Sequence, residues 1–292
     1  HFEINGWKPM ILYSEHLLWG NNDLGTITME LGYAIYIAGE VGGEWTNLND
    51  YYVIGDIEVP EDSTLTIGPG VNVLFTGFYN FNVEGTIIAE GTENDSIFFT
   101  SNQPVPDISD WGSIKLHSVS NIFRYVKYEY ADNGIVGNHD ISGSIFENCL
   151  ITEIPQWPEQ GGHDEHDRGR WDCHGLYAEE ECDNCIFNNN VIVADLYHGI
   201  KIEGSARNVQ ITGNTINIYG MGIHIGGDPA QNSPPDSSVI SFNTINFEQN
   251  GMSGIEANNC ANCVFEGNTI LSQSGGGLKS NYSYNVKIIN NI

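Results

Sequence analysis

The sequence predicts an all-β chain wound as a right-handed parallel β-helix solenoid, with about two dozen residues per coil and two loop insertions. Three observations predict this fold. An asparagine-bearing phrase recurs along the last third of the chain, a glycine-bearing phrase runs in step with it, and apolar and polar residues alternate at period two. Each repeat is too short to bury its own apolar side, so stacked repeats must share one core.

The asparagine phrase is clearest at 209–216, which reads VQITGNTI, and it recurs at 239–245 and 264–270. By subtraction, the separations of its markers are 24, 29, 25 and 23 residues for Asn190, Asn214, Asn243, Asn268 and Asn291. A polar residue at an inward corner is costly unless it is paired, and stacked amides can pair with one another and with turn backbone. The alternative is that these are turn asparagines that tolerate left-handed φ. Both interpretations predict the same fold.

The glycine phrase has the form Gly, aliphatic, any residue, then a small or aliphatic residue, and it begins at Gly175, Gly199, Gly222, Gly254 and Gly277. Alternation at period two indicates strands, because successive side chains of a strand point to opposite faces. Parallel stacking of such strands, about 4.8 Å apart, gives one continuous core.

The N-terminal part of the chain lacks this regularity. Trp7, Trp19, Tyr33 and Tyr36 are scattered among apolar runs, and we expect residues 1–44 to cap the solenoid or to form a preceding segment. Residues 45–292 are expected to form the β-helix. Because the chain stops inside a repeat, we expect the β-helix to continue beyond the C-terminus.

Short alternating segments separated by Gly, Pro and Asp continue the coils toward the N-terminus. The phrases LTIGPGV (65–71), VEGTIIAEGT (83–92), IFFTS (97–101) and WGSI (111–114) resemble the secreted right-handed parallel β-helix repeat proteins of bacteria and archaea. The resemblance implies this fold and an extracellular or cell-surface location. It does not choose an activity, because that family includes surface proteins, adhesins, and polysaccharide lyases, hydrolases and epimerases. The sequence holds no complete catalytic signature of those enzymes.

The amino-acid composition limits the kinds of molecule that this chain can bind. The formal net charge is −28, from 38 acidic and 10 basic side chains. Nucleic acid is therefore excluded, because its sequence-independent binding needs Lys and Arg, and so is an anionic membrane surface. No run approaches the roughly 18 apolar residues of a membrane span. The charge suits Ca²⁺ binding, a saline or secreted setting, or simple solubility.

Six cysteines are present, and four of them form two similar phrases, Cys182 with Cys185 and Cys260 with Cys263. The two phrases are three coils apart, roughly 14 Å along the axis, too far for a bridge between them or for a four-cysteine zinc site. Local disulfides within each pair and one from Cys149 to Cys173 would use all six. Alternatively, Cys149 is a buried thiol, since it stands where later coils have asparagine.

Two insertions interrupt the repeat. The spacing between equivalent aliphatic residues is 41 from Ile135 to Leu176 and 32 from Ile223 to Ile255, against 24 and 23 in the coils between them. The extra residues form loops at 152–173 and 226–236. Insertions in a solenoid map to loops, and loops often carry function. We expect these two loops to flank one face from opposite sides.

Alternation places one outward column on that face: Tyr177, Lys201, His224, Glu256 and Lys279, with His174, His198, Met221 and Ser253 beside it. A groove walled by two loops and floored by these residues is a candidate polysaccharide site. The alternative is an exposed strand face that simply carries polar residues.

Two reactions suit such a groove. In β-elimination of a uronate polysaccharide, Lys201 would neutralise the carboxylate, His198 or His224 would act as base, and Tyr177 would act as acid. Hydrolysis would instead need two facing carboxylates, for which Glu256 and Asp228 are the candidates.

The first loop carries possible ligands for a divalent metal such as Ca²⁺: His163, Asp164, His166 and Asp167. Alternatively, the segment pairs its own charges with the arginines that follow. Trp157, Trp171 and Glu256 are candidate glycan contacts, although the tryptophans can equally pin the loop to the coil. We expect no organic cofactor.

Two functions therefore remain open. One is a secreted surface or matrix β-helix with a structural or adhesive role, which binds a polysaccharide or cell-surface glycan and self-assembles end to end. The other is a polysaccharide-active enzyme, most simply a lyase, that uses the groove carrying Tyr177, Lys201 and His224.

Overall fold

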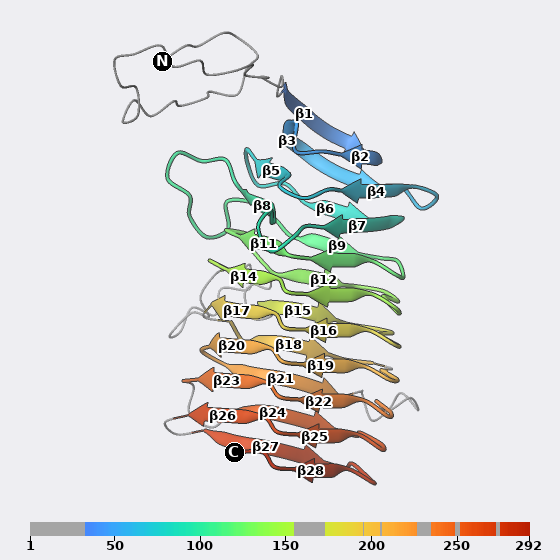
Figure 1. The fold of residues 1–292 in the computed structure, drawn as a ribbon, viewed down its shortest axis with the longest axis vertical. Coiled ribbons are helices and arrows are strands. Elements are labelled where there is room, and N and C mark those ends of the chain that lie inside the picture. The colour runs from blue at the N-terminus through green and yellow to red at the C-terminus, as the bar shows by residue number, and fades with distance from the viewer. Residues whose placement is uncertain are drawn as a thin grey trace, which may run out of the picture.

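The computed structural model describes residues 33–154, 173–194, 196–204, 206–226, 235–248, 252–272 and 275–292. The described strands wind into a parallel β-helix, seen in Figure 1 as a tall stack of coils. The predicted fold class is confirmed. The described residues contain no helix with the length and apolarity that a membrane crossing requires.

Each coil contributes strands to three parallel stacks. The first stack contains β1 (Tyr33–Glu40), β3 (Asn49–Val59), β5 (Asn72–Phe75), β8 (Ile97–Ser101), β11 (Val126–Glu129), β14 (Leu150–Thr152), β17 (Val191–Ala194), β20 (Thr215–Ile218), β23 (Thr244–Phe247) and β26 (Thr269–Ser272). The second continues from the C-terminal half of β3 through β6 (Phe81–Val83), β9 (Ile114–Leu116), β12 (Ile135–Gly137), β15 (His174–Ala178), β18 (His198–Ile202), β21 (Met221–Gly226), β24 (Ser253–Asn258) and β27 (Gly276–Asn281).

The third stack contains β2 (Gly43–Trp45), β4 (Thr64–Ile67), β7 (Thr86–Glu90), β10 (Ile122–Arg124), β13 (Ile145–Glu147), β16 (Ile186–Asn188), β19 (Gln210–Thr212), β22 (Val239–Ser241), β25 (Val264–Glu266) and β28 (Lys287–Ile289). The long strand β3 pairs with both β5 and β6, which joins the first two stacks into one 18-stranded sheet.

Parallel pairing begins before residue 45. Strand β1 pairs with β3 from Tyr33 opposite Asn49 to Glu40 opposite Glu58. Residues 33–44 therefore belong to the strand stacks, although the sequence assigned them to a cap or a preceding segment. Residues 1–32 lie outside the described part of the chain.

The asparagine ladder forms as predicted. Asn190 Nδ2 donates to Asn214 Oδ1 (3.0 Å), and the same bond repeats from Asn214 to Asn243 (2.9 Å). It continues from Asn243 to Asn268 (2.9 Å) and from Asn268 to Asn291 (2.8 Å). Each of these amides also donates to a backbone carbonyl of the preceding coil. The ladder thus satisfies buried polar groups at every corner between the third and first stacks.

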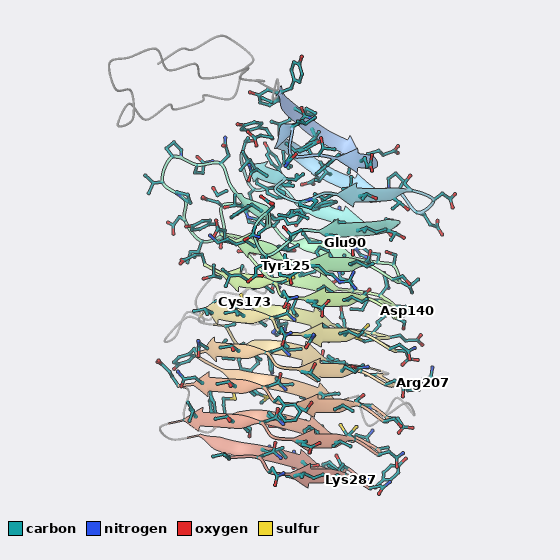
Figure 2. All side chains as sticks on the ribbon, in the orientation of Figure 1. Glu90, Tyr125, Asp140, Cys173, Arg207 and Lys287 are labelled. Carbon is teal, nitrogen blue, oxygen red and sulfur yellow. The ribbon has the colours of Figure 1, made fainter. Side chains whose placement is uncertain are left out.

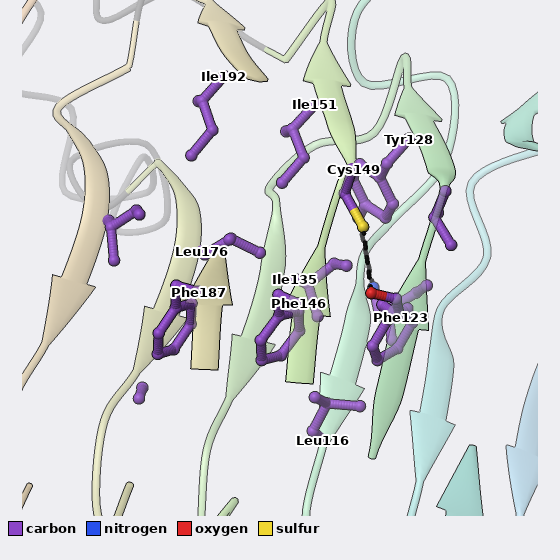
Figure 3. Packing of buried hydrophobic residues seen from close by; sticks show 14 of the residues in the cluster. Leu116, Phe123, Tyr128, Ile135, Phe146, Cys149, Ile151, Leu176, Phe187 and Ile192 are labelled. Atoms are coloured by element: carbon purple, nitrogen blue, oxygen red, sulfur yellow. Dashed lines mark hydrogen bonds between the residues drawn. The ribbon is translucent and has the colours of Figure 1, made fainter. Parts of the chain in front are cut away.

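Cys149 occupies the ladder position one coil earlier. Its backbone N–H donates to Asn190 Oδ1 (3.0 Å), and its Sγ donates to the Phe123 carbonyl at 3.4 Å (Figure 3). Burial raises the pKa of the Cys149 thiol to about 12. The alternative that the sequence left open, a buried thiol, is therefore confirmed.

The six cysteines are all free and buried, so the expected local disulfides are absent from the structure. The Cys182 and Cys185 thiols contact one another, as do those of Cys260 and Cys263. Cys173 directly precedes β15. Figure 2 shows it on the opposite edge of the stack from Arg207.

The core is built from columns of identical or similar side chains. Phe123, Phe146 and Phe187 stack in successive coils, with ring centroids 5.4 and 5.1 Å apart and nearly parallel planes (Figure 3). Each is essentially inaccessible to solvent. Burial of each ring stabilises the fold by about 1.5–3 kcal/mol, and the columns hold successive coils in register. This register is what brings distant outward residues together.

Candidate functional site: a polar wall on the second stack

The outward column predicted from the sequence exists. Tyr177 of β15 pairs with Lys201 of β18, and Lys201 pairs with His224 of β21. His224 pairs with Glu256 of β24, and Glu256 pairs with Lys279 of β27. We call the outward face that these five residues line the polar wall. Its four steps between coils span about 19 Å along the axis.

Glycines at the start of these strands permit this close arrangement. A Cβ at Gly199 would lie 2.5 Å from Ile216 Cγ2 and 2.8 Å from the Gly222 carbonyl oxygen. A Cβ at Gly222 would lie 2.3 Å from Ile245 Cγ2. Only glycine therefore fits at these two positions, where the first and second stacks meet. Two residues later, each strand carries its residue of the polar wall, Lys201 or His224.

Lys201 is the cation at the centre of the wall. Only 8% of the residue is exposed, and its Nζ lies 3.0 Å from Glu203 Oε1 and 4.8 Å from the centroid of the Tyr177 ring. The Tyr177 hydroxyl donates to the other carboxylate oxygen, Glu203 Oε2, at 2.6 Å. A buried ammonium group is costly unless it is paired, so these contacts hold Lys201 in a fixed place.

Two histidines lie behind the wall. His174 and His198 are buried, and their Nδ1 atoms are 3.3 Å apart. Burial lowers the pKa of His174 to about 3 and of His198 to about 2, with the Lys201 charge acting in the same direction. Both rings are therefore neutral at pH 7. Met221 and Ser253, expected beside them, are also largely buried and do not add to the exposed wall.

His224 is the histidine nearest to solvent in this group. Its ring stacks on His198 with centroids 5.5 Å apart, and its Nε2 lies 3.2 Å from Asn258 Nδ2. Burial lowers the pKa of His224, while the carboxylates of Glu203 and Glu256 act against that shift. The geometry fits a neutral imidazole that keeps its lone pair on Nε2.

Glu256 is the wall residue of β24, and its carboxylate accepts three hydrogen bonds. Its Oε1 accepts from Lys279 Nζ at 3.2 Å, from Asn258 Nδ2 at 3.1 Å and from Asn281 Nδ2 at 3.4 Å. The Lys279 side chain is 53% exposed, so this pair contributes little to stability. Glu256 therefore acts as a hydrogen-bond acceptor in this arrangement.

Three members of the site were missed from the sequence: Glu203, Asn258 and Asn281. They form a second outward column, because Ile202, Ala257 and Ser280 occupy the inward position just before them. Period-two alternation already predicts an outward residue two places after Lys201, Glu256 and Lys279. The alternation therefore predicts this second column as well. Its residues lie just after the last residue of each glycine phrase, which is why the phrase itself did not indicate them.

Several predicted site residues lie outside the described part of the chain: Trp157, Trp171, His163, Asp164, His166, Asp167 and Asp228. Within the described part, no group of three or more His, Cys, Asp or Glu side chains is arranged to hold a metal ion. The two long loops expected to wall the groove also fall mainly in the undescribed segments, so the groove itself stays a prediction.

A cavity of about 470 Å³ lies on a different face, along the outward side of the first stack. Val193, Asn217 and Asn246 form one column of its lining, with Glu153 and Glu248 at the strand ends. Its carboxylates have no described cationic partner within 4.0 Å. It contains none of the residues of the polar wall.

No protein-family model matches this chain, and no curated protein matches it in sequence. Among solved structures, it is similar to endopolygalacturonase I from Stereum purpureum at 15% identity, with 88% of this chain and 92% of that chain covered and a TM-score of 0.34. A variant of the periplasmic alginate epimerase AlgG matches at 12% identity, with 89% and 77% covered and a TM-score of 0.32.

An alginate lyase from Paenibacillus sp. matches at 12% identity, with 76% of this chain and 91% of that chain covered and a TM-score of 0.26. The chain and these three solved structures align over most of their lengths. At such identities and TM-scores the matches carry no information about the reaction, which has to be argued from the polar wall itself.

Proposed function

We propose that this chain acts on an acidic polysaccharide at the polar wall, by β-elimination of a uronate polymer. The observation that supports the proposal is the consecutive placement of Tyr177, Lys201 and His224 in three neighbouring coils. The backbones that carry an acid, a cation and a base therefore follow one another at intervals of about 4.8 Å, and the Tyr177 side chain extends over Lys201 Nζ to Glu203 in the next coil, which brings its hydroxyl toward the coil of the base. A linear polymer lying along the axis would meet them in that order.

The role of each of these three residues follows from whether its side chain can accept a proton, give one or carry a positive charge. His224 is neutral at pH 7, because burial lowers its pKa, so its Nε2 can accept the proton from the carbon next to the uronate carboxylate once the substrate displaces the hydrogen bond from Asn258 Nδ2. Tyr177 carries a hydroxyl proton that it can give to the leaving glycosidic oxygen as the C–O bond breaks. Lys201 would neutralise the carboxylate on which negative charge accumulates. The new carbon–carbon double bond leaves an unsaturated sugar end.

His224 is a better base than His198, the other residue that the sequence suggested. His198 is only 4% exposed and its Nδ1 faces His174 Nδ1. Its pKa of about 2 also makes it a weak proton acceptor.

Hydrolysis fits the described residues less well. The carboxylates on the wall, Glu203 and Glu256, both accept hydrogen bonds or ion pairs from neighbouring donors. Hydrolysis needs two carboxyl groups that face one another across the scissile bond, and both of these are engaged by side chains of the wall itself.

The test is a polymer panel. Polygalacturonate and alginate are incubated with the protein, with and without Ca²⁺, and unsaturated ends are followed by ultraviolet absorbance. We expect cleavage of at least one polymer and its loss in Lys201→Ala. The matched control is Lys115→Ala, which removes an amine from the same outward column two coils before Tyr177 and should keep full activity.

The alternative role is a surface or matrix protein that binds glycan without cleaving it. The same wall would then serve as a binding surface, and an extracellular location belongs to both versions. Binding of a polymer without any unsaturated ends, under all conditions of the panel, would favour this alternative. End-to-end assembly stays a separate prediction, for which electron microscopy of the purified chain is the test.

A further inference from the structure

The Glu203 carboxylate contacts both Lys201 and Tyr177, the two side chains that would donate to the substrate in the proposed elimination. Glu203 Oε1 is paired with Lys201 Nζ, and Glu203 Oε2 accepts from the Tyr177 hydroxyl. Within the described residues, Glu203 is the carboxylate paired with Lys201. The proposed elimination assigns Lys201 to the sugar carboxylate and Tyr177 to the leaving glycosidic oxygen, so Glu203 holds both side chains that the sugar would contact.

We propose that Glu203 occupies the place of the substrate carboxylate and thereby determines how strongly the polar wall binds an acidic polysaccharide. This inference rests on the proposed function and adds the residue that sets its selectivity. A uronate must displace Glu203 from Lys201 before it can bind, whereas a neutral sugar has no carboxylate that competes for that position.

The surroundings of Glu203 suit displacement. Its side chain is 38% exposed, whereas the side chain of Lys201 is only 10% exposed. Ile202 pairs with Ile225, so the position beside Glu203 in the next coil is Gly226, which has no side chain. The carboxylate can therefore turn toward solvent while the ammonium group stays in place. Partly exposed ion pairs are weak enough for such an exchange.

The neighbouring charges work against a polyanion as well. Glu179, in the same outward column one coil earlier, is exposed and has no ion pair within 4.0 Å among the described residues. The whole chain carries a net charge of −28. Among the described residues, Glu203 is the carboxylate within 4.0 Å of Lys201 Nζ, so its effect should be local and much larger than that of Glu179.

The decisive variant is Glu203→Gln, which keeps the length of the side chain and a hydrogen-bond acceptor for Tyr177 but removes the charge. Calorimetric titration is done with an oligogalacturonate of defined length and with a neutral oligoglucoside of equal length. We expect the variant to bind the oligogalacturonate about tenfold more tightly than the native chain, because a close unit charge is removed. Binding of the neutral sugar should change less than twofold.

The matched control is Glu179→Gln, which changes the net charge by the same amount one coil away. It should tighten oligogalacturonate binding less than twofold. Nuclear magnetic resonance of the His224 ring reports on the folded site without any ligand, because the Glu203 charge raises the pKa of His224. Glu203→Gln should therefore lower that pKa, and Glu179→Gln should leave it nearly unchanged.

The outcomes are distinguishable. Oligogalacturonate binding that is equal or weaker in Glu203→Gln, while the native chain binds it, overturns the inference and leaves the proposed function standing. An unchanged pKa of His224 in that variant also overturns it, since Glu203 would then not face the wall. If neither protein binds the oligogalacturonate although the pKa of His224 falls, the titration is repeated with an oligoalginate, and absence of binding there too makes the proposed function fail and this inference with it.

Discussion

The asparagine ladder gives the sharpest prediction about stability. We expect Asn214→Ala to destabilise the protein far more than Asn291→Ala, although both remove the same side chain from the same ladder. Asn214 is fully buried, and its Oδ1 accepts from Asn190 N (2.9 Å) and Asn190 Nδ2 (3.0 Å). Its Nδ2 donates to the Phe187 carbonyl at 2.9 Å. The substitution removes one hydrogen bond from each of those three groups, although Asn190 Nδ2 keeps its other bond, to the Phe146 carbonyl.

The magnitude follows from counting these groups. The Asn190 N–H loses its partner, which costs about 1–3 kcal/mol, and each further buried hydrogen bond that is lost costs about 0.5–1.5 kcal/mol, so we expect a total of about 3 kcal/mol. Asn291 makes the equivalent contacts to Asn268 and Phe265, but it is only half-buried, so water can replace it. We expect Asn291→Ala to cost about 1 kcal/mol.

Urea unfolding followed by circular dichroism measures both variants under the same conditions. The reasoning is refuted if Asn214→Ala costs no more than Asn291→Ala. It is also refuted if Asn214→Ala is within about 1 kcal/mol of the native chain, since buried groups cannot lose three hydrogen bonds so cheaply.

Three further predictions concern the wall and its support. Gly222→Ala should lower the free energy of unfolding in urea by about 2–3 kcal/mol, because its Cβ would lie 2.3 Å from Ile245 Cγ2. Gly277→Ala should be nearly neutral, because no atom lies within 4 Å of its Cβ. Equal effects of the two substitutions would contradict the packing. Acid should destabilise the protein between pH 6.5 and about 3. The folded pKa values of His174 and His198, about 3 and 2, lie below the ordinary 6.5, so the unfolded chain binds protons first. Stability should fall by about 1.4 kcal/mol per pH unit for each ring, and replacement of both by Gln should flatten that slope. Because the pKa of His224 is lowered, the elimination rate should stay constant from pH 8 down to 6.5 and decline only at lower pH; a decline that begins above pH 7 would exclude this ring as the base.

The fold could be predicted from the sequence because its signals are local and repeated. The asparagines at 190, 214, 243, 268 and 291 recur at the coil spacing, and the ladder forms between those residues. The wall column was equally predictable, since alternation and spacing alone place Tyr177, Lys201 and His224 in neighbouring coils. Such patterns fix the register, and the register fixes which outward residues meet.

The chemistry of the wall was less predictable, because it depends on side-chain reach and burial. Glu203 was missed although it lies two residues after Lys201, and its contacts with Lys201 and Tyr177 follow from side-chain directions that spacing does not give. The depth of burial of His198 was also not visible in the sequence, and that burial is what makes it a weak base. The cysteine pairing was predicted wrongly, because sequence proximity does not report whether thiols are oxidised.

Histidine resonances test the central claim most directly, since His224 belongs to the polar wall and His174 and His198 lie behind it, while His139 and His117 lie three and four coils before His224, just after β12 and β9. Titration of the protein with an oligogalacturonate, followed by nuclear magnetic resonance of the imidazole groups, reports which rings sense the ligand. We predict that the His224 resonances shift first and furthest, and that those of His117 and His139 stay in place. Shifts confined to His117 and His139, with an unmoved His224, would contradict a glycan site on this wall.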